Sequence, residues 1–105
     1  MSAAYLVIYD GEPDDPEAFA DYYENVHGPM LWGFPGIRDV QIHLRQGGAG
    51  PFLVTRLVFD SLGELVEAVE GPYRATTRRD MDENILPRFH GTVRHVITDV
   101  HIPSR

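Results

Sequence analysis

The chain has 105 residues, of which 43% are hydrophobic and 24% charged, and these values predict a single domain over residues 1–105. Sixteen acidic side chains against nine basic ones give a formal net charge of −7. Nucleic acids and anionic membranes bind concentrated positive charge, so neither is expected as a partner. Cysteine is absent, which excludes disulfide bonds, thiolate chemistry and cysteine-based metal centres.

The N-terminal stretch "AYLVIYDG", residues 4–11, predicts a strand because it is rich in β-branched and aromatic residues and ends in a glycine. No basic region precedes its apolar run, and the run is far shorter than the ~20 residues that span a bilayer. We therefore expect a cytoplasmic location and no contact with membranes.

The next segment carries the signals of an amphipathic helix. Asp15 is a suitable N-cap and Pro16 fits the first helical turn. The positions i, i+3, i+4 and i+7 of one apolar face are then occupied by Phe19, Tyr22, Tyr23 and Val26. Gly28 and Pro29 predict the end of this helix.

The rest of the chain predicts a hairpin, two helical segments and a last strand. Residues 37–46 alternate between apolar and polar side chains, and residues 52–59 form a second β-run beyond a glycine-rich turn. Ser61–Glu64 matches the S-x-x-E capping box of a helix. Residues 73–85 continue as a further helix, and residues 91–103 close the chain as a strand.

Histidines in the predicted strands suggest a polar seam. His43 has the parity opposite to the apolar side chains of its strand, and we assign His95, His101 and Asp99 to the polar side in the same way. A sheet with helices on one face leaves its other face uncovered. We therefore expect these residues to lie between the two subunits of a homodimer.

The element order is β-α-β twice, which is the ferredoxin-like split β-α-β pattern of an α+β protein. The stretches "PEAFADYYENVHGPM" and "FPGIRDV" resemble the EthD-like family of the dimeric α+β barrel superfamily, in which a Phe-led helix runs into a His-x-Pro turn and then a Pro-Gly. The matching residues are Phe19, Tyr22, His27, Pro29, Pro35 and Gly36. The resemblance implies a four-stranded antiparallel sheet, a homodimer, and a cleft between sheet and helices for a small hydrophobic or aromatic ligand.

His27 is the candidate catalytic residue. In the similar lactone isomerases the histidine at this position lies in the cleft, and an imidazole with a pKa near about 6.5 exchanges protons at neutral pH. Alternatively, the ring of His27 interacts with free carbonyls at the helix end. The sequence leaves both interpretations open.

Five residues are candidates for ligand binding. Tyr5 and Tyr9 lie four residues apart in the first strand and so share a face, while Tyr23 lies on the helix. Trp32 follows the helix and would form a wall of the cleft. By the resemblance, Val40 takes the place of a tyrosine of the lactone isomerases. The alternative for the tyrosines is a purely structural role in the core or at an interface.

Three functions remain open. The first is a cofactor-independent enzyme of the isomerase, cyclase or lyase type that uses His27 to transfer protons on a small aromatic or polyketide-like molecule. The second is a non-catalytic binding or accessory protein of a catabolic or biosynthetic pathway. The third is a haem-binding or monooxygenase-like protein. No HExxH run or His pair at i, i+4 spacing occurs, so we expect no metal site and no cofactor.

Overall fold

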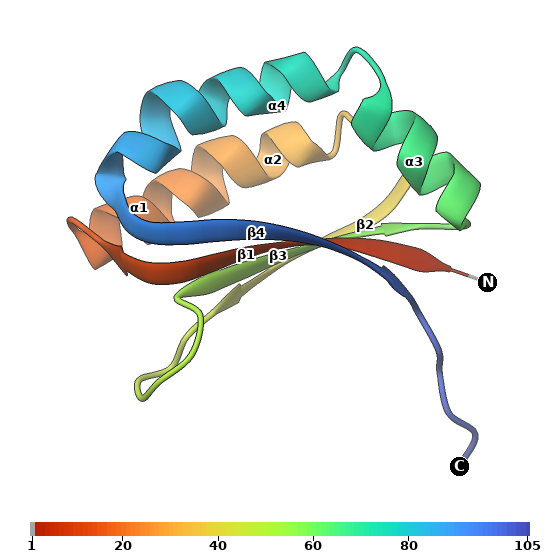
Figure 1. The fold of residues 1–105 in the computed structure, drawn as a ribbon, viewed down its shortest axis with the longest axis horizontal. Helices are drawn as coiled ribbons and strands as arrows, with labels where there is room; N and C mark the ends of the chain where they lie inside the picture. The colour runs from red at the N-terminus through yellow and green to blue at the C-terminus, as the bar shows by residue number, and fades with distance from the viewer. Residues whose placement is uncertain (1) are drawn as a thin grey trace.

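The computed structural model describes residues 2–105, which form one antiparallel sheet with helices on one face (Figure 1). The strands lie in the order β2-β3-β1-β4, and their bounds are Ala3–Pro13 for β1, Ile37–Leu44 for β2, Leu53–Phe59 for β3 and Phe89–Asp99 for β4. The predicted α+β class, a ferredoxin-like split β-α-β with a four-stranded antiparallel sheet, is confirmed.

The first helical run is continuous and covers β1. It consists of α1 (Pro16–Tyr22), the π turn η1 (Tyr23–His27) and α2 (Gly28–Leu31). Asp15 caps it as predicted, because its Oδ1 accepts a hydrogen bond from the backbone N–H of Ala18 at 3.2 Å.

The prediction that Gly28 and Pro29 end this helix is wrong. The N–H of Gly28 donates to the carbonyl of Tyr23, five residues earlier, which is the hydrogen bond of a π turn. Pro29 then lies in the first turn of α2, where its missing N–H leaves no helical hydrogen bond unmade. A Cβ at Gly28 would lie 2.9 Å from the carbonyl oxygen of Tyr23, so the close approach requires glycine.

The second helical run lies beside the first over the sheet (Figure 1). Its segments are α3 (Leu62–Glu70), α4 (Arg74–Asp80), the π turn η2 (Met81–Ile85) and the 3₁₀ turn η3 (Leu86–Arg88). Ser61 caps α3 as predicted, with its Oγ 3.2 Å from the N–H of Glu64. Among residues 2–105, no helix is long and apolar enough to cross a lipid bilayer.

The core lies between the sheet and the two helical runs. Every second residue of β1 and β3 points into it, and the largest side chains that are fully buried there include Tyr9, Tyr23, Leu53, Leu57, Phe59, Leu65 and Ile85. The side of the sheet that faces the helices is therefore closely packed and rich in aromatic side chains, and the two helical runs pack on it.

The placement of His95 and Asp99 on the uncovered face is wrong. His95 pairs with Val7 and Asp99 pairs with Ala3, and residues directly opposite each other in an antiparallel sheet share a face. Both therefore lie on the side of the helices. The strand β4 is an edge strand with apolar residues at both parities, so alternation alone does not identify its inner face.

The opposite face of the sheet is uncovered. His43 lies there, as predicted, because it pairs with Val54. The aliphatic side chains on this face are half-buried, and they are Leu6, Ile8, Val54, Val58 and Val96. His101 follows the end of β4 and is exposed.

The close approach of the paired strands β1 and β4 at Gly91 gives the first prediction. Gly91 has φ +150°, and a Cβ at this position would lie 2.0 Å from the carbonyl oxygen of Asp10. We expect Gly91→Ala to lower the free energy of unfolding by about 1–3 kcal/mol, because backbone atoms have to move apart. Gly63→Ala is the control: Gly63 lies in α3, where a Cβ would make only an ordinary contact of 3.9 Å with Oγ of Ser61, and alanine there should stabilise the protein. Urea denaturation of both variants checks this, and a neutral Gly91→Ala would contradict it.

Candidate functional site

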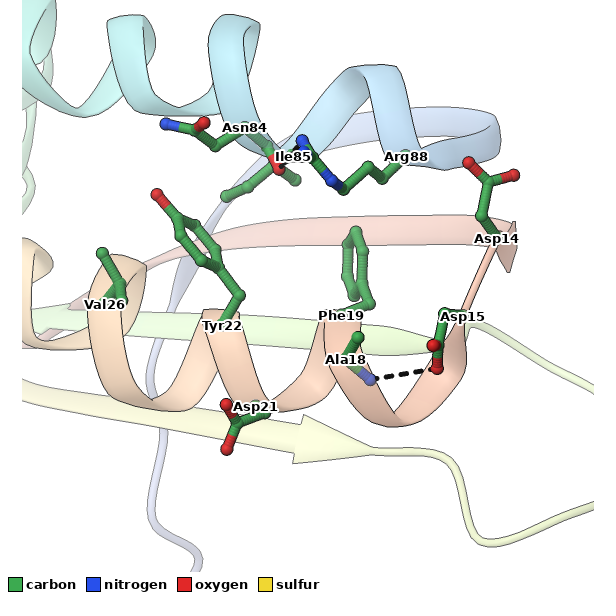
Figure 2. Close-up of a pocket in the computed structure, with 10 residues that line it drawn as sticks. All are labelled: Asp14, Asp15, Ala18, Phe19, Asp21, Tyr22, Val26, Asn84, Ile85 and Arg88. Atoms are coloured by element: carbon green, nitrogen blue, oxygen red, sulfur yellow. Dashed lines mark hydrogen bonds between the residues drawn. The ribbon is translucent and has the colours of Figure 1, made fainter.

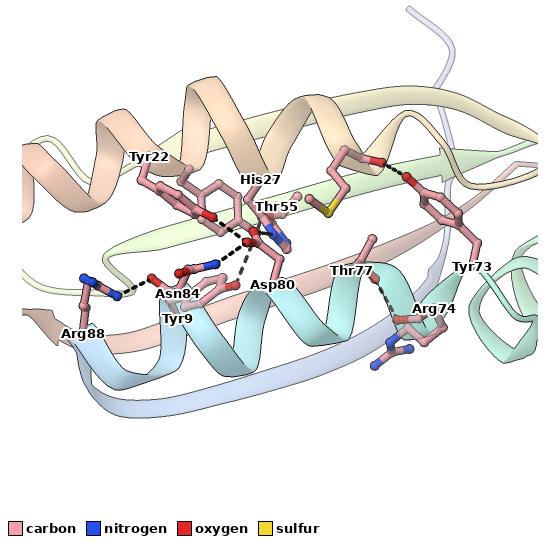
Figure 3. A network of polar contacts seen from close by, with 12 residues as sticks. Tyr9, Tyr22, His27, Thr55, Tyr73, Arg74, Thr77, Asp80, Asn84 and Arg88 are labelled. Atoms are coloured by element: carbon pink, nitrogen blue, oxygen red, sulfur yellow. Dashed lines mark hydrogen bonds and ion pairs between the residues drawn. The ribbon is translucent and has the colours of Figure 1, made fainter.

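A buried histidine and a buried aspartate join the two helical runs (Figure 3). His27 is the last residue of η1 and is 1% exposed, and its Nδ1 lies 2.8 Å from Oδ2 of Asp80. Asp80 is the last residue of α4 and directly precedes η2. Each π turn therefore adjoins one member of the pair, and such turns are frequent at functional sites.

Asp80 accepts hydrogen bonds from two further side chains. The hydroxyl of Tyr22 donates to its Oδ1, and Nδ2 of Asn84 donates to the same oxygen at 2.8 Å. Burial by itself would raise the pKa of Asp80, but the hydrogen bonds from Tyr22, Asn84 and His27 outweigh it and lower the pKa. Asp80 is therefore an ionised acceptor, and the hydrogen on Nδ1 of His27 points at it.

His27 is consequently a neutral ring with its second nitrogen free. Burial lowers the pKa of His27 below its ordinary value, and the neighbouring Asp80 offsets only part of this effect. Within residues 2–105, Nε2 makes no hydrogen bond, and no buried side-chain nitrogen or oxygen is left without a partner. Nε2 therefore reaches open space and presents a lone pair to it.

That space is a small cavity between the sheet and α4. It measures about 20 Å³, and its walls include Tyr5, Tyr23, His27, Leu57, Arg74, Thr77, Met81 and His95. This volume holds about one water molecule. A second hollow of about 340 Å³ along β4 shares the walls formed by Met81 and His95. Met81 and His95 therefore lie between the small cavity and the outer hollow.

Tyr23 holds the ring of His27 in position. The two ring centroids are 4.9 Å apart, and the hydroxyl of Tyr23 lies 2.5 Å from Oγ1 of Thr55 on β3. Tyr9 donates to the same hydroxyl at 3.3 Å. Burial raises the pKa of Tyr23 to about 12, so this phenol stays protonated. Tyr23 is thus a rigid support rather than an acid or base.

The structure brings some of the candidate residues together and separates others. Tyr5, Tyr23 and His27 line the small cavity. Tyr9 is fully buried behind Tyr23 and is not a cavity wall. Val40 is half-buried against the core, and Trp32 is 52% exposed on the surface; neither lines the cavity.

Three residues of the site were not among the candidates: Asp80, Arg74 and His95. The sequence signal for Asp80 is that Asp80 and Met81 occupy the places expected from the resemblance to the EthD-like family, in a predicted helix, without a role for the carboxylate. This signal is weak, because charged residues are common on exposed helical faces. Arg74 gives no local signal at all.

The other side of the Asp80 network faces a surface groove (Figure 2). The groove has a volume of about 480 Å³ and lies between α1 and the segments η2 and η3, with Phe19, Tyr22, Asn84, Ile85 and Arg88 among its walls. Tyr22 and Asn84 thus contact both the groove and Asp80. The network separates this groove from the cavity at His27.

The site does not fit a metal ion or a haem. Among residues 2–105, no group of three or more His, Asp and Glu side chains could hold a metal ion. The cavity at Nε2 of His27 measures about 20 Å³, which is far too small for a porphyrin ring. The histidine at this site therefore does not fit a role as a haem ligand.

No family model matches the sequence, and no curated protein matches it either. Solved structures that share its fold include the following three. An EthD family protein from Bacillus halodurans is 21% identical with a TM-score of 0.79, over 96% of this chain and 100% of that one. SnoaB, a cofactor-independent oxygenase from Streptomyces nogalater, is 10% identical with a TM-score of 0.68, over 97% and 95%. A dimeric ferredoxin-like protein of unknown function from Thermobifida fusca is 8% identical with a TM-score of 0.70, over 95% and 92%.

These likenesses define the class of fold. The chain has the ferredoxin-like fold of an EthD family protein and of the Thermobifida fusca protein, so the resemblance seen in the sequence is confirmed at the level of the fold. Identities of this size carry no activity from one protein to another.

The central position of Asp80 gives the second prediction. Asp80→Asn would replace an oxygen by an amide donor that faces the donors of His27, Tyr22 or Asn84. We expect the free energy of unfolding at pH 7 to fall by about 2–4 kcal/mol. Asp82→Asn is the control, because Asp82 makes only an exposed ion pair with Arg78 and should lose less than about 1 kcal/mol.

The pH dependence provides a second check of the same prediction. The pKa of Asp80 is lower in the folded protein than its ordinary value, so its contribution is complete above about pH 4 and is lost as the pH falls through the folded pKa. Urea denaturation should show the difference between wild type and Asp80→Asn shrinking in acid. Equal stability of Asp80→Asn and Asp82→Asn at pH 7 would show that the network is not required.

Proposed function

We propose that this protein is a cofactor-independent enzyme that transfers protons on a small aromatic or polyketide-like molecule. The observation that supports the proposal is a buried, neutral His27 whose Nδ1 is held by an ionised Asp80 while Nε2 opens into a cavity. General bases in enzymes are arranged in this way, with the proton on one nitrogen fixed by a carboxylate and the other nitrogen free.

The reaction follows from this arrangement. Nε2 of His27 removes a proton from a carbon next to a carbonyl group, and the electron pair of the broken C–H bond moves into an enolate. The ring becomes an imidazolium ion, and the Asp80 carboxylate stabilises the new charge. Return of the proton to a different atom isomerises the substrate. Alternatively, the enolate carbon attacks a second carbonyl and closes a ring, and the alkoxide that forms takes the proton back from the imidazolium ion.

The fold comparisons agree with chemistry that needs no cofactor. SnoaB is described as a cofactor-independent oxygenase, and it shares this fold along nearly the whole chain. The proposal for this chain rests on its own side chains, because the sequence identity to SnoaB is 10%. A cytoplasmic location remains part of the proposal.

Binding without turnover is the second candidate function. The observation that favours it is the size of the inner cavity, about 20 Å³, which admits only a small group of a ligand. A binding protein would use the same walls but would not need the lone pair on His27. The two functions therefore differ in what a substitution of His27 does.

The third prediction concerns His27. Phenylacetone has an acidic CH₂ group next to a carbonyl, and its exchange of hydrogen for deuterium in D₂O can be followed by NMR. We expect the protein to catalyse this exchange, with a rate that rises with pH through the lowered pKa of His27, below about 6.5, and then stays level. His27→Ala should lower the rate about 100-fold or more.

Two further variants make this test specific. His27→Gln retains an amide donor for Asp80 but has no titrating base, so it should lose the exchange while keeping most of the stability. His101→Ala removes an exposed histidine beyond the end of β4 and should leave the rate unchanged. Exchange at the wild-type rate in His27→Gln would refute proton transfer by His27 and favour the binding function.

We also propose that the protein is a homodimer that associates through the uncovered face of the sheet. Five half-buried aliphatic side chains lie on that face, and the Thermobifida fusca protein of the same fold is described as dimeric. Association would remove this apolar surface from water and help a chain of 105 residues, whose core is small.

The fourth prediction tests this assembly. Sedimentation velocity should find a dimer at micromolar concentration, and Ile8→Arg should give a monomer, because Ile8 lies on the uncovered face and a buried unpaired charge opposes association. Leu62→Arg is the control, since Leu62 is 49% exposed on α3 and should leave the dimer intact. A wild-type monomer at that concentration would overturn the proposal.

A further inference from the structure

Arg74 is a half-buried cation with no partner of opposite charge. It lies on α4 (Figure 3). It lines the cavity at His27, and its guanidinium carbon is 5.6 Å from the centre of the Tyr5 ring. Within the described residues the guanidinium group makes one hydrogen bond, a long one of 3.5 Å to the carbonyl oxygen of Val69. No carboxylate of the described chain lies within ion-pair distance of it, although four other arginines have one: Arg38, Arg45, Arg78 and Arg94.

Arg56, Arg79, Arg88 and Arg105 also lack an ion pair in the described chain, but of these unpaired arginines only Arg74 lines the cavity at His27. Sixteen aspartates and glutamates are available for nine basic residues, and the guanidinium group carries five N–H donors in a fixed fork. A half-buried arginine that leaves most of these donors unused beside a cavity is positioned to receive an acceptor from outside the chain.

Tyr5 and His95 line the cavity together with Arg74. Tyr5 on β1 shares a hydrogen bond of 2.9 Å with Nδ1 of His95 on β4, so three elements meet at this point. If Tyr5 donates, the remaining hydrogen of a neutral His95 is on Nε2 and is available to a ligand. Burial and the charges of Arg74 and Arg78 lower the pKa of His95, which indicates a positive local field. Arg74 supplies the permanent charge of this field.

We infer that Arg74 binds an acidic group of the ligand, so that the molecules that reach His27 are small organic anions, carboxylates with a reactive carbonyl above all. The inference rests on the proposed function to the extent that both use the cavity at His27. Arg74, His95 and His27 line the same cavity, so the carboxylate would contact Arg74 and His95 while the carbon that loses its proton lies against His27.

The fifth prediction tests Arg74 with a matched pair of probes. Phenylpyruvate and phenylacetone both have a phenyl ring and a CH₂ group beside a ketone, and they differ in a carboxylate against a methyl group. We expect NMR titration to show that the wild-type protein binds phenylpyruvate at least about tenfold more tightly than phenylacetone. The reason is that a charge-assisted hydrogen bond to the carboxylate contributes about this much to binding. Arg74→Gln should reduce this ratio to about one.

Two controls separate the local effect from a general one. Arg79→Gln removes the same charge from the same helix at an exposed position, so the ratio should remain that of the wild type. Arg74→Lys retains the charge without the fork and should give an intermediate ratio. Thermal unfolding of each variant shows that the fold is retained.

The outcomes distinguish this inference from the proposed function. Equal binding of the two probes to the wild type, undetectable binding of phenylpyruvate up to its solubility limit, or a preference that survives Arg74→Gln would overturn the role of Arg74. Preference for phenylpyruvate without deuterium exchange that depends on His27 would support Arg74 and refute the proton transfer. Deuterium exchange that depends on His27, together with equal binding of the two probes, would support proton transfer by His27 and overturn the role of Arg74.

Discussion

The hydrogen bond between His27 and Asp80 is the interaction on which the rest of the site depends. It joins two helical runs that are 53 residues apart in the sequence, and it does so where both partners are almost completely buried. An unpaired polar group in such a place costs about 1–3 kcal/mol, so each helical run fixes the position of the other. The same bond sets the proton on Nδ1 and leaves Nε2 as the free nitrogen.

Two π turns bring this pair together. Each contains a backbone hydrogen bond over five residues, from Gly28 to Tyr23 and from Leu86 to Met81, and a proline follows each of these donors. One residue inserted into a helical turn rotates the next part of the helix by about 100°. The turn at Tyr23–His27 therefore changes which residues of α2 face the sheet, relative to the pattern set in α1.

Charge is distributed unevenly around the cavity. The chain as a whole is acidic, yet the side chains that line the small cavity include Arg74 and His95 and no carboxylate. The one buried carboxylate nearby, Asp80, lies behind His27 and is satisfied by three donors. His27, the base, and Arg74, the fixed cation, line the same cavity. An anionic ligand that binds to Arg74 is therefore held close to His27.

Local rules in the sequence determined the elements and the fold class. Caps at Asp15 and Ser61 depend on neighbours within a few residues, and both appear as predicted. Helical periodicity correctly predicted Phe19 and Tyr23 in the core, but it wrongly predicted Val26 on the same buried face: the π turn at Tyr23–His27 changes the phase of the helix, and Val26 is 43% exposed. The resemblance identified His27. Packing alone decided the rest: the path of the first helix beyond Gly28, the inner position of His95 on an edge strand, and the pairing of His27 with Asp80. These features depend on contacts between residues that are far apart in the chain, and the chemistry of a short stretch does not encode which distant side chain will lie against it.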